Sequence, residues 1–484
     1  MKILVSVFFI VFISCKLFAQ DANLRKLGRN EMKEDLEFYK TLLNQLHPGQ
    51  YLFTNKTTVD SSFNETANNL PDSLNIKEFF SLVCPLTQSI KDLHTNIYLP
   101  KMFKSITKIL PFKLLCEDSR LYVTENHSEI KEINVGDEIT SINGESIVDI
   151  CKKLKKYINV YDSNISTDNV VEIKHSFALL FSEFILQPDA YNLTIRNQFG
   201  STKQFECKAL DKSEKDFSDL ASFSKLIKEI YPNKTVEYKF IDSLNTAYLK
   251  INSFDIKLSY IRAVRKFFKK ADEEKYPNLI LDLRDNPGGN YVLGGGLLEY
   301  FIDEKFTLID SAVYLKKGKL DLDKKLVLSY QNFYWGLKYD SLNNQFYRKE
   351  LRYYPNKRHY NGNVIVLTNT YTMSTASMVA SFLKGYNKAT VIGEETANSY
   401  YHFSAGGFLR VRLPNSKIAT QIPLALLTLN VPVEVNDINA GVIPEVESRN
   451  TVQDKIKNFD RPLNVAFDLI KQKAISSKRK ETGK

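Results

Sequence analysis

Apolar residues recur at helical spacing near the start of the chain. Steps of three and four residues separate Met32, Leu36, Tyr39 and Leu43, as on one face of an α-helix. A second apolar stretch covers residues 79–86. The segment SIKDLHTNIYLP then predicts the end of a helix and a strand at residues 95–99. We therefore expect a helical N-terminal domain over residues 24–102.

Short β segments replace the helical pattern from residue 108 to about residue 197. LPFKLLCE and RLYVTE come first, and VGDEITSINGESIVDICKKL follows. In the last segment a Gly136-Asp137 turn precedes an apolar strand, a tight Asn143-Gly144 turn and a helix. That order resembles a PDZ domain, and a plain hairpin at Asn143-Gly144 is the alternative explanation. We expect a PDZ-like β domain over residues 103–200.

Strands and helices alternate from about residue 236 to residue 446, which predicts an α/β core. The strand TAYLKIN leads to a helix with Ile261, Val264 and Phe268 on one face, and then to the continuously apolar strand at residues 279–283. The turn DNPGGN, a helix, the strand VIVL, a second helix and the strand ATVIG follow. We place the core at residues 230–450, with a C-terminal helix and basic tail over residues 451–484.

Composition narrows the class of protein. The 484 residues are 43% apolar and 12% aromatic, which excludes a disordered chain and allows about three domains. The formal net charge is +10, but basic and acidic residues are interspersed except in the tail. This distribution favours a solvated surface over a nucleic-acid groove, so we expect no nucleic-acid partner.

The first residues, MKILVSVFFIVFISCKLFAQ, resemble a secretory signal. A short basic start precedes an apolar run, and Ala19 offers a small residue for cleavage. We predict a signal peptide at residues 1–19 and an exported, periplasmic or extracellular protein. An uncleaved anchor and lipidation at Cys15 are the alternatives, and we expect membrane association only with the lipid. Four other cysteines allow three disulfide pairings, among which the sequence does not choose.

Ser374 stands where the strand VIVL gives way to a helix. The helix buries one face through Ala376, Val379 and Leu383, and Ser374 lies at its very start. A hydroxyl there lies beside free backbone N–H groups and the positive end of the helix dipole, which stabilise an oxyanion. Ser374 is thus a candidate nucleophile. The alternative is a helix cap, because serine is a preferred capping residue.

A glycine turn in DLRDNPGGN, residues 282–290, follows the apolar strand of the core. Its glycines allow a substrate backbone to approach and expose N–H groups. Gly288 or Gly289 can supply one oxyanion donor, alongside the N–H of Thr375. The chain lacks GxGxxG and Gly-Lys-Ser/Thr motifs at this turn, which disfavours a nucleotide site. His and Cys lack metal-ligand spacing, and we expect no metal or organic cofactor.

These motifs together resemble the serine peptidase family of the carboxy-terminal processing (tail-specific) proteases and tricorn-core enzymes. TAYLKINSF, LILDLRDNPGGN, VIVLTNTYTMSTASMVASFLKG and ATVIGEET follow the family's order. The resemblance implies a crotonase/ClpP-like βαβ core, with Ser374 as nucleophile and Thr375 with Gly288 or Gly289 as oxyanion donors. The processing proteases carry a lysine base three residues after the Thr of GE-x-T. Here that position is Ser399, which disfavours a Ser-Lys dyad.

The tricorn-like branch takes a histidine base from an upstream D-G-H segment, which KDLHTN resembles at Asp92, Leu93 and His94. A neutral imidazole accepts the serine proton at neutral pH and returns it to the leaving amine. By the same resemblance an orienting carboxylate lies in VPVEVNDINAGVIPEVE, where we favour Glu434 over Asp437. His402 is the competing base.

The sequence therefore predicts an exported serine endopeptidase that acts on a peptide or protein through an acyl-enzyme. A catalytically silent, PDZ-like peptide-binding protein on the same fold is the alternative. The missing lysine and Leu93, which stands where glycine is usual, support that alternative.

Overall fold

The computed structural model describes residues 25–100, 105–158, 171–221, 234–315, 322–330, 337–340, 345–348, 351–432, 437 and 439–482. The predicted signal peptide with Cys15 and the predicted carboxylate Glu434 lie outside these residues. Within them, no helix is long and apolar enough to cross a membrane.

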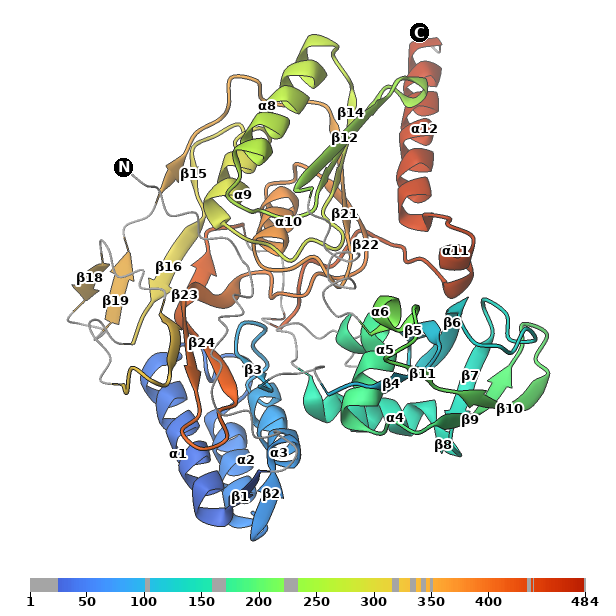
Figure 1. Ribbon diagram of the computed structural model, residues 1–484. Helices are drawn as coiled ribbons and strands as arrows, with labels where there is room; N and C mark the ends of the chain where they lie inside the picture. The colour runs from blue at the N-terminus through green and yellow to red at the C-terminus, as the bar shows by residue number, and fades with distance from the viewer. Residues whose placement is uncertain are drawn as a thin grey trace.

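Three helices form the N-terminal part of the molecule (Figure 1): α1 (Arg29–Leu46), α2 (Lys56–Asn68) and α3 (Ile76–Gln88). Side chains of Asn55 and Asn75 cap α2 and α3 by accepting backbone N–H groups. The residues at helical spacing on α1 are buried against the other helices. A short ribbon of β1 (Lys26–Gly28) and β2 (Ser73–Asn75) closes this part.

A separate β domain covers residues 105–221. Its main sheet has the order β10-β9-β7-β6-β5, with β8 on β7. The strands are β5 (Phe112–Glu117), β6 (Arg120–Asn126), β7 (Glu138–Ile142), β8 (Glu145–Ser146), β9 (Ala190–Arg196) and β10 (Thr202–Lys208). Helices α4 (Ile147–Leu154) and α5 (Val171–Phe184) pack on it, and β4 (Lys108–Ile109), β11 (Leu210–Asp211), η1 (Lys155–Tyr157) and α6 (Phe217–Leu220) complete the domain. Asn143 and Gly144 both have positive φ and form the predicted tight turn.

The core is a mostly parallel sheet of order β12-β13-β14-β21-β22-β25. Its strands are β12 (Val236–Ile241), β13 (Thr246–Ile251), β14 (Asn278–Asp282), β21 (Asn363–Thr368), β22 (Thr390–Gly393) and β25 (Val446–Glu447), and η3 (Asp242–Leu244) joins the first two. Helices α8 (Leu258–Glu273), α9 (Tyr291–Leu298) and α10 (Thr375–Gly385) cover one face, and α12 (Arg461–Thr482), preceded by α11 (Val452–Ile456), covers the other. The predicted α/β class is confirmed.

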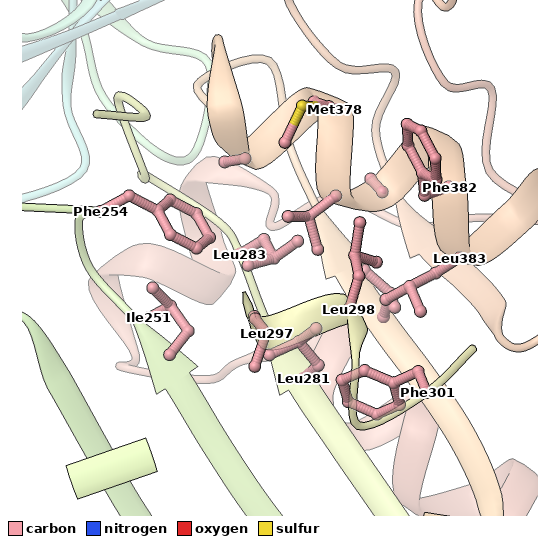
Figure 2. Packing of buried hydrophobic residues seen from close by; sticks show 14 of the residues in the cluster. Ile251, Phe254, Leu281, Leu283, Leu297, Leu298, Phe301, Met378, Phe382 and Leu383 are labelled. Carbon is pink, nitrogen blue, oxygen red and sulfur yellow. The ribbon is translucent and has the colours of Figure 1, made fainter. Parts of the chain in front are cut away.

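Alternate residues of the core strands serve the two faces. Leu281 points toward Leu297, Phe301 and Leu383 on one side (Figure 2), whereas Ile280 packs with α12 on the other. Both faces are therefore apolar, which explains why the strand at residues 279–283 is continuously apolar in the sequence.

A second sheet joins the N-terminal helices to the core. It has the order β16-β24-β23-β17, with β3 (Asn96–Tyr98) on β24. Its other strands are β16 (Ile309–Val313), β17 (Val327–Tyr330), β23 (His402–Arg412) and β24 (Ala419–Leu429). The far end of the β23–β24 hairpin packs on α1 and α3 (Figure 1). The pairs β15 (Phe306–Thr307) with β20 (Arg352–Tyr353), and β18 (Leu337–Asp340) with β19 (Gln345–Arg348), lie outside this sheet.

Candidate active site

Ser374 occupies a strained turn between β21 and α10. Its backbone has φ 50° and ψ −122°, a conformation that non-glycine residues rarely adopt and that costs about 1–3 kcal/mol. Although it precedes the first helical residue, its side chain makes no capping hydrogen bond. The residue therefore does not serve as the ordinary cap that its position suggested. A serine on a sharp strand-to-helix turn presents its hydroxyl at the end of the sheet.

Several buried side chains hold this turn. The N–H of Ser374 donates to the Oδ1 of Asn398, which is fully buried. The N–H of Met373 donates to the carbonyl of Asn286 over 2.9 Å, and the Thr372 hydroxyl donates to the carbonyl of Leu283 over 3.0 Å. Asn398 was not among the predicted site residues. Its only sequence signal is its place two residues after the Thr of GE-x-T.

The glycine turn lies directly against Ser374. A Cβ added to Gly288 would stand 2.6 Å from the Ser374 Cβ and 2.9 Å from the Thr375 nitrogen. A Cβ on Gly289 would stand 2.6 Å from the carbonyl oxygen of Phe254. Both glycines have positive φ, of 94° and 133°. Only glycine satisfies both the backbone conformation and the space at this turn.

Two backbone N–H groups beside Ser374 are available to a ligand. The N–H groups of Gly289 and Thr375 make no hydrogen bond within the described residues, whereas the N–H of Gly288 donates to the Oδ1 of Asn286 over 2.8 Å. The Thr375 hydroxyl donates to the carbonyl of Gly289 over 2.9 Å and joins the two segments. The geometry thus distinguishes the two glycines that the sequence left as alternatives.

His94 lies in the turn between α3 and β3. Its ring stacks near Phe403 and Phe408 of β23, with centroid distances of 6.2 and 5.8 Å. Its carbonyl accepts a hydrogen bond from the amide of Gln421 over 3.0 Å. Burial lowers the pKa of His94, while the Asp92 carboxylate opposes that effect. The imidazole is therefore neutral at neutral pH, as a base must be.

The segment between Asn398 and Phe403 connects the two predicted catalytic residues. Asn398 binds the backbone of Ser374, and Phe403 packs on the ring of His94. Within the described residues, no hydrogen bond joins His94 to Ser374, and the buried Nδ1 of His94 has no partner. His94 and Ser374 thus contact opposite ends of the same segment and form no catalytic pair with each other.

The other predicted site residues have local roles. The Nδ1 of His402 lies 3.1 Å from the Thr428 hydroxyl, and burial lowers the pKa of His402. At the position of the missing lysine, the buried Ser399 hydroxyl accepts the N–H groups of Tyr401 and His402 over 3.4 Å each. The exposed Asp437 accepts the backbone N–H of Asn439 over 2.9 Å.

Comparison with known proteins finds a peptidase family model that matches the part of the chain around this site. The model of peptidase family S41 matches residues 245–405, which include Ser374, the glycine turn and Asn398 but not His94. Mature CPAF complexed with lactacystin is similar over 92% of this chain and 98% of its own, with 16% identity and a TM-score of 0.62. Mature CPAF alone gives 91% and 96% coverage, 16% identity and a TM-score of 0.61. At this identity the likeness shows a shared fold. No curated protein matches the sequence.

Proposed function

The chain belongs to peptidase family S41 and is a serine-type peptidase, and from this premise we propose that it is an exported endopeptidase with Ser374 as nucleophile and His94 as base. The observation that carries the proposal is the turn at Ser374. A serine without a capping role, held in a strained conformation beside two unused N–H groups, meets the needs of acyl transfer.

In the proposed reaction, the Ser374 hydroxyl attacks the scissile carbonyl and gives its proton to His94. The N–H groups of Gly289 and Thr375 bind the resulting oxyanion. His94 then protonates the leaving amine, the acyl-enzyme forms, and a water molecule hydrolyses it by the reverse sequence of proton transfers. Each preorganised oxyanion donor of this kind contributes about 2.7–4 kcal/mol to catalysis.

The base must approach the nucleophile for this reaction. The proposed mechanism requires the His94 ring within about 3 Å of the Ser374 hydroxyl in the substrate complex, where catalytic hydrogen bonds often tighten. Burial supports a neutral His94, and the β23–β24 hairpin links its turn to the core. We assign Glu434 as the carboxylate that orients His94, in keeping with the family resemblance.

The β domain is proposed to receive the substrate as an added strand. Its edge strand, β5, is the end of the sheet order, and pairing with an extended peptide is a known mode of recognition for such an edge. Tyr371 and Met373, in the loop before Ser374, belong to the same apolar cluster as α5. A peptide bound by this domain would therefore lie close to the nucleophile.

Labelling with a fluorophosphonate probe tests the nucleophile. We expect the wild type to react and Ser374→Ala to remain unlabelled, because the probe needs an activated serine. Ser377→Ala is the matched control, since Ser377 lies one turn later in α10 and its hydroxyl donates to the Thr372 carbonyl over 3.4 Å. Equal labelling of Ser374→Ala and the wild type would disprove the assignment.

Peptide cleavage by His94→Ala and His402→Ala tests the base. We expect His94→Ala to lose about 100-fold or more in kcat and His402→Ala to keep most activity. The reverse result would transfer the role to His402. If neither the wild type nor any variant reacts with the probe, the protein is the catalytically silent peptide-binding alternative. The absence of a Ser374–His94 hydrogen bond in the structure favours that alternative.

Export predicts a mature protein that starts at Gln20. A secreted product that starts at Met1 would contradict cleavage after Ala19.

A further inference from the structure

A second histidine, His47, is buried behind the turn that carries His94. It caps the C-terminal end of α1, and its side chain has no exposed surface. Its Nε2 lies 2.9 Å from the Oδ2 of Asp92 and 2.6 Å from the Thr95 hydroxyl. The sequence His47-Pro48-Gly49 by itself indicates no more than a turn. Instead, the structure places this histidine in a buried polar network with Asp92 and Thr95, inside an apolar domain.

Asp92 connects this network to His94. Its Oδ1 accepts the backbone N–H of His94 over 3.2 Å, and its Oδ2 accepts the Thr95 hydroxyl. The carboxylate therefore holds the backbone N–H of His94 and the side chain of the next residue, Thr95. Burial opposes ionisation of Asp92, but the hydrogen bonds of its carboxylate with His47 and Thr95 help to outweigh burial, so the pKa of Asp92 lies below its usual value. An ionised carboxylate inside a domain requires such donors.

The remaining contacts of His94 are apolar or neutral. Phe403 and Phe408 of β23 flank its ring, and Gln421 of β24 binds its carbonyl. Asp92 and His47 are the titratable groups that act on it within the described residues. The Asp92 carboxylate is thus the charged group that holds the His94 turn within the described residues, alongside the neutral amide of Gln421, and His47 and Thr95 hold that carboxylate in turn.

We propose that His47 is a positioning residue of this peptidase, which holds Asp92 so that the Asp92 carboxylate aims the His94 turn at Ser374. The inference rests on the proposed function, in which His94 is the base. It gives the N-terminal domain a second task, because this domain then supplies both the base and its support. His47 itself touches neither the substrate nor the reacting atoms.

Steady-state kinetics of His47 variants test the inference. We expect His47→Leu to lower kcat about 10- to 100-fold with KM changed less than about threefold, because a misplaced base slows the chemical step without weakening substrate binding. His47→Gln places an amide N–H near the position of Nε2 and should restore kcat to within about fivefold of the wild type. His47→Asn, whose amide is one methylene shorter, should not.

The Gln and Asn variants keep the test decisive if His47→Leu fails to fold, since both are polar and similar in size. His127→Leu is the control, because His127 also lies near carboxylates but belongs to the β domain. Its ring nitrogens lie 3.3 Å from Glu125 and 3.4 Å from Asp216. The kcat of this variant should equal that of the wild type. If His94→Ala loses activity while His47→Asn and His47→Gln have equal kcat, the positioning role is refuted and the proposed function stands. If His94→Ala keeps full activity, the proposed base fails first.

Discussion

Replacing Gly288 by alanine should lower the reactivity of Ser374 about 100-fold while leaving the fold intact. The added Cβ would lie 2.6 Å from the Ser374 Cβ, at least about 0.8 Å short of the 3.4 Å at which ordinary contact begins. Backbone atoms of Met373 and Thr375 lie 2.9 Å away on the same side and limit any local adjustment. The glycine turn and the nucleophile must therefore separate by about 1 Å.

The size of the effect follows from that displacement. A misplacement of about 1 Å costs on the order of 100-fold in rate, which corresponds to about 2.7 kcal/mol in the activation free energy. The positive φ of 94° adds about 1–2 kcal/mol of destabilisation to the folded state, because an L-residue is strained there. We therefore expect two separable results, a modest loss of stability and a large loss of reactivity.

Gly144→Ala supplies the matched control. Gly144 has a similar φ of 80°, but nothing lies within 4 Å of its added Cβ. Both variants should lose about 1–2 kcal/mol in the free energy of unfolding, measured by urea denaturation. Only Gly288→Ala should lose about 100-fold in the rate of fluorophosphonate labelling. A labelling rate of Gly288→Ala within twofold of Gly144→Ala would refute the close contact between the glycine turn and Ser374.

Three further predictions concern the support of the site. Asn398→Leu should lower the labelling rate at least tenfold because the Ser374 N–H loses its acceptor, whereas equal rates in Asn398→Leu and the wild type would refute a role for that bond. Arg284→Leu should lower the free energy of unfolding in urea by about 3–5 kcal/mol, because Arg284 neutralises the fully buried Asp282. The control, Lys33→Gln, removes an exposed ion pair and should cost under about 0.5 kcal/mol. Equal losses in the two variants would contradict the role of Arg284. Burial lowers the pKa of His175 to about 3, with Lys174 and Lys455 adding to the effect and Glu117 opposing it. The unfolded state therefore binds the proton first, and stability falls as pH drops below about 6.5, by about 1–2 kcal/mol at pH 5. His175→Phe should remove this part of the pH dependence, and an unchanged slope between pH 7 and pH 5 would contradict it.

The sequence by itself determined the α/β class and carried the motifs that resemble the S41 peptidases. Continuous apolar strands, glycine turns and helical faces depend on short-range periodicity, so LILDL, DNPGG and the helix after Ser374 were readable without coordinates. The same local rules placed Ser374 at a strand-to-helix turn, because the strand and the helix have different periods. Gly288 and Gly289 were found together, since both belong to one turn.

Only the tertiary structure decided which groups are free to act. The N–H of Gly288 donates to Asn286, whereas the N–H of Gly289 does not. The direction of each N–H depends on the backbone angles of the turn, which cannot be predicted residue by residue from the sequence. Contacts between residues far apart in the chain could not be predicted from the sequence either. Asn398 reaches Ser374 across 24 residues and His47 reaches Asp92 across 45, because folding, not sequence proximity, brings them together. Burial then fixed the charge states, since a buried imidazole stays neutral and a buried carboxylate stays ionised only with donors that distant segments supply.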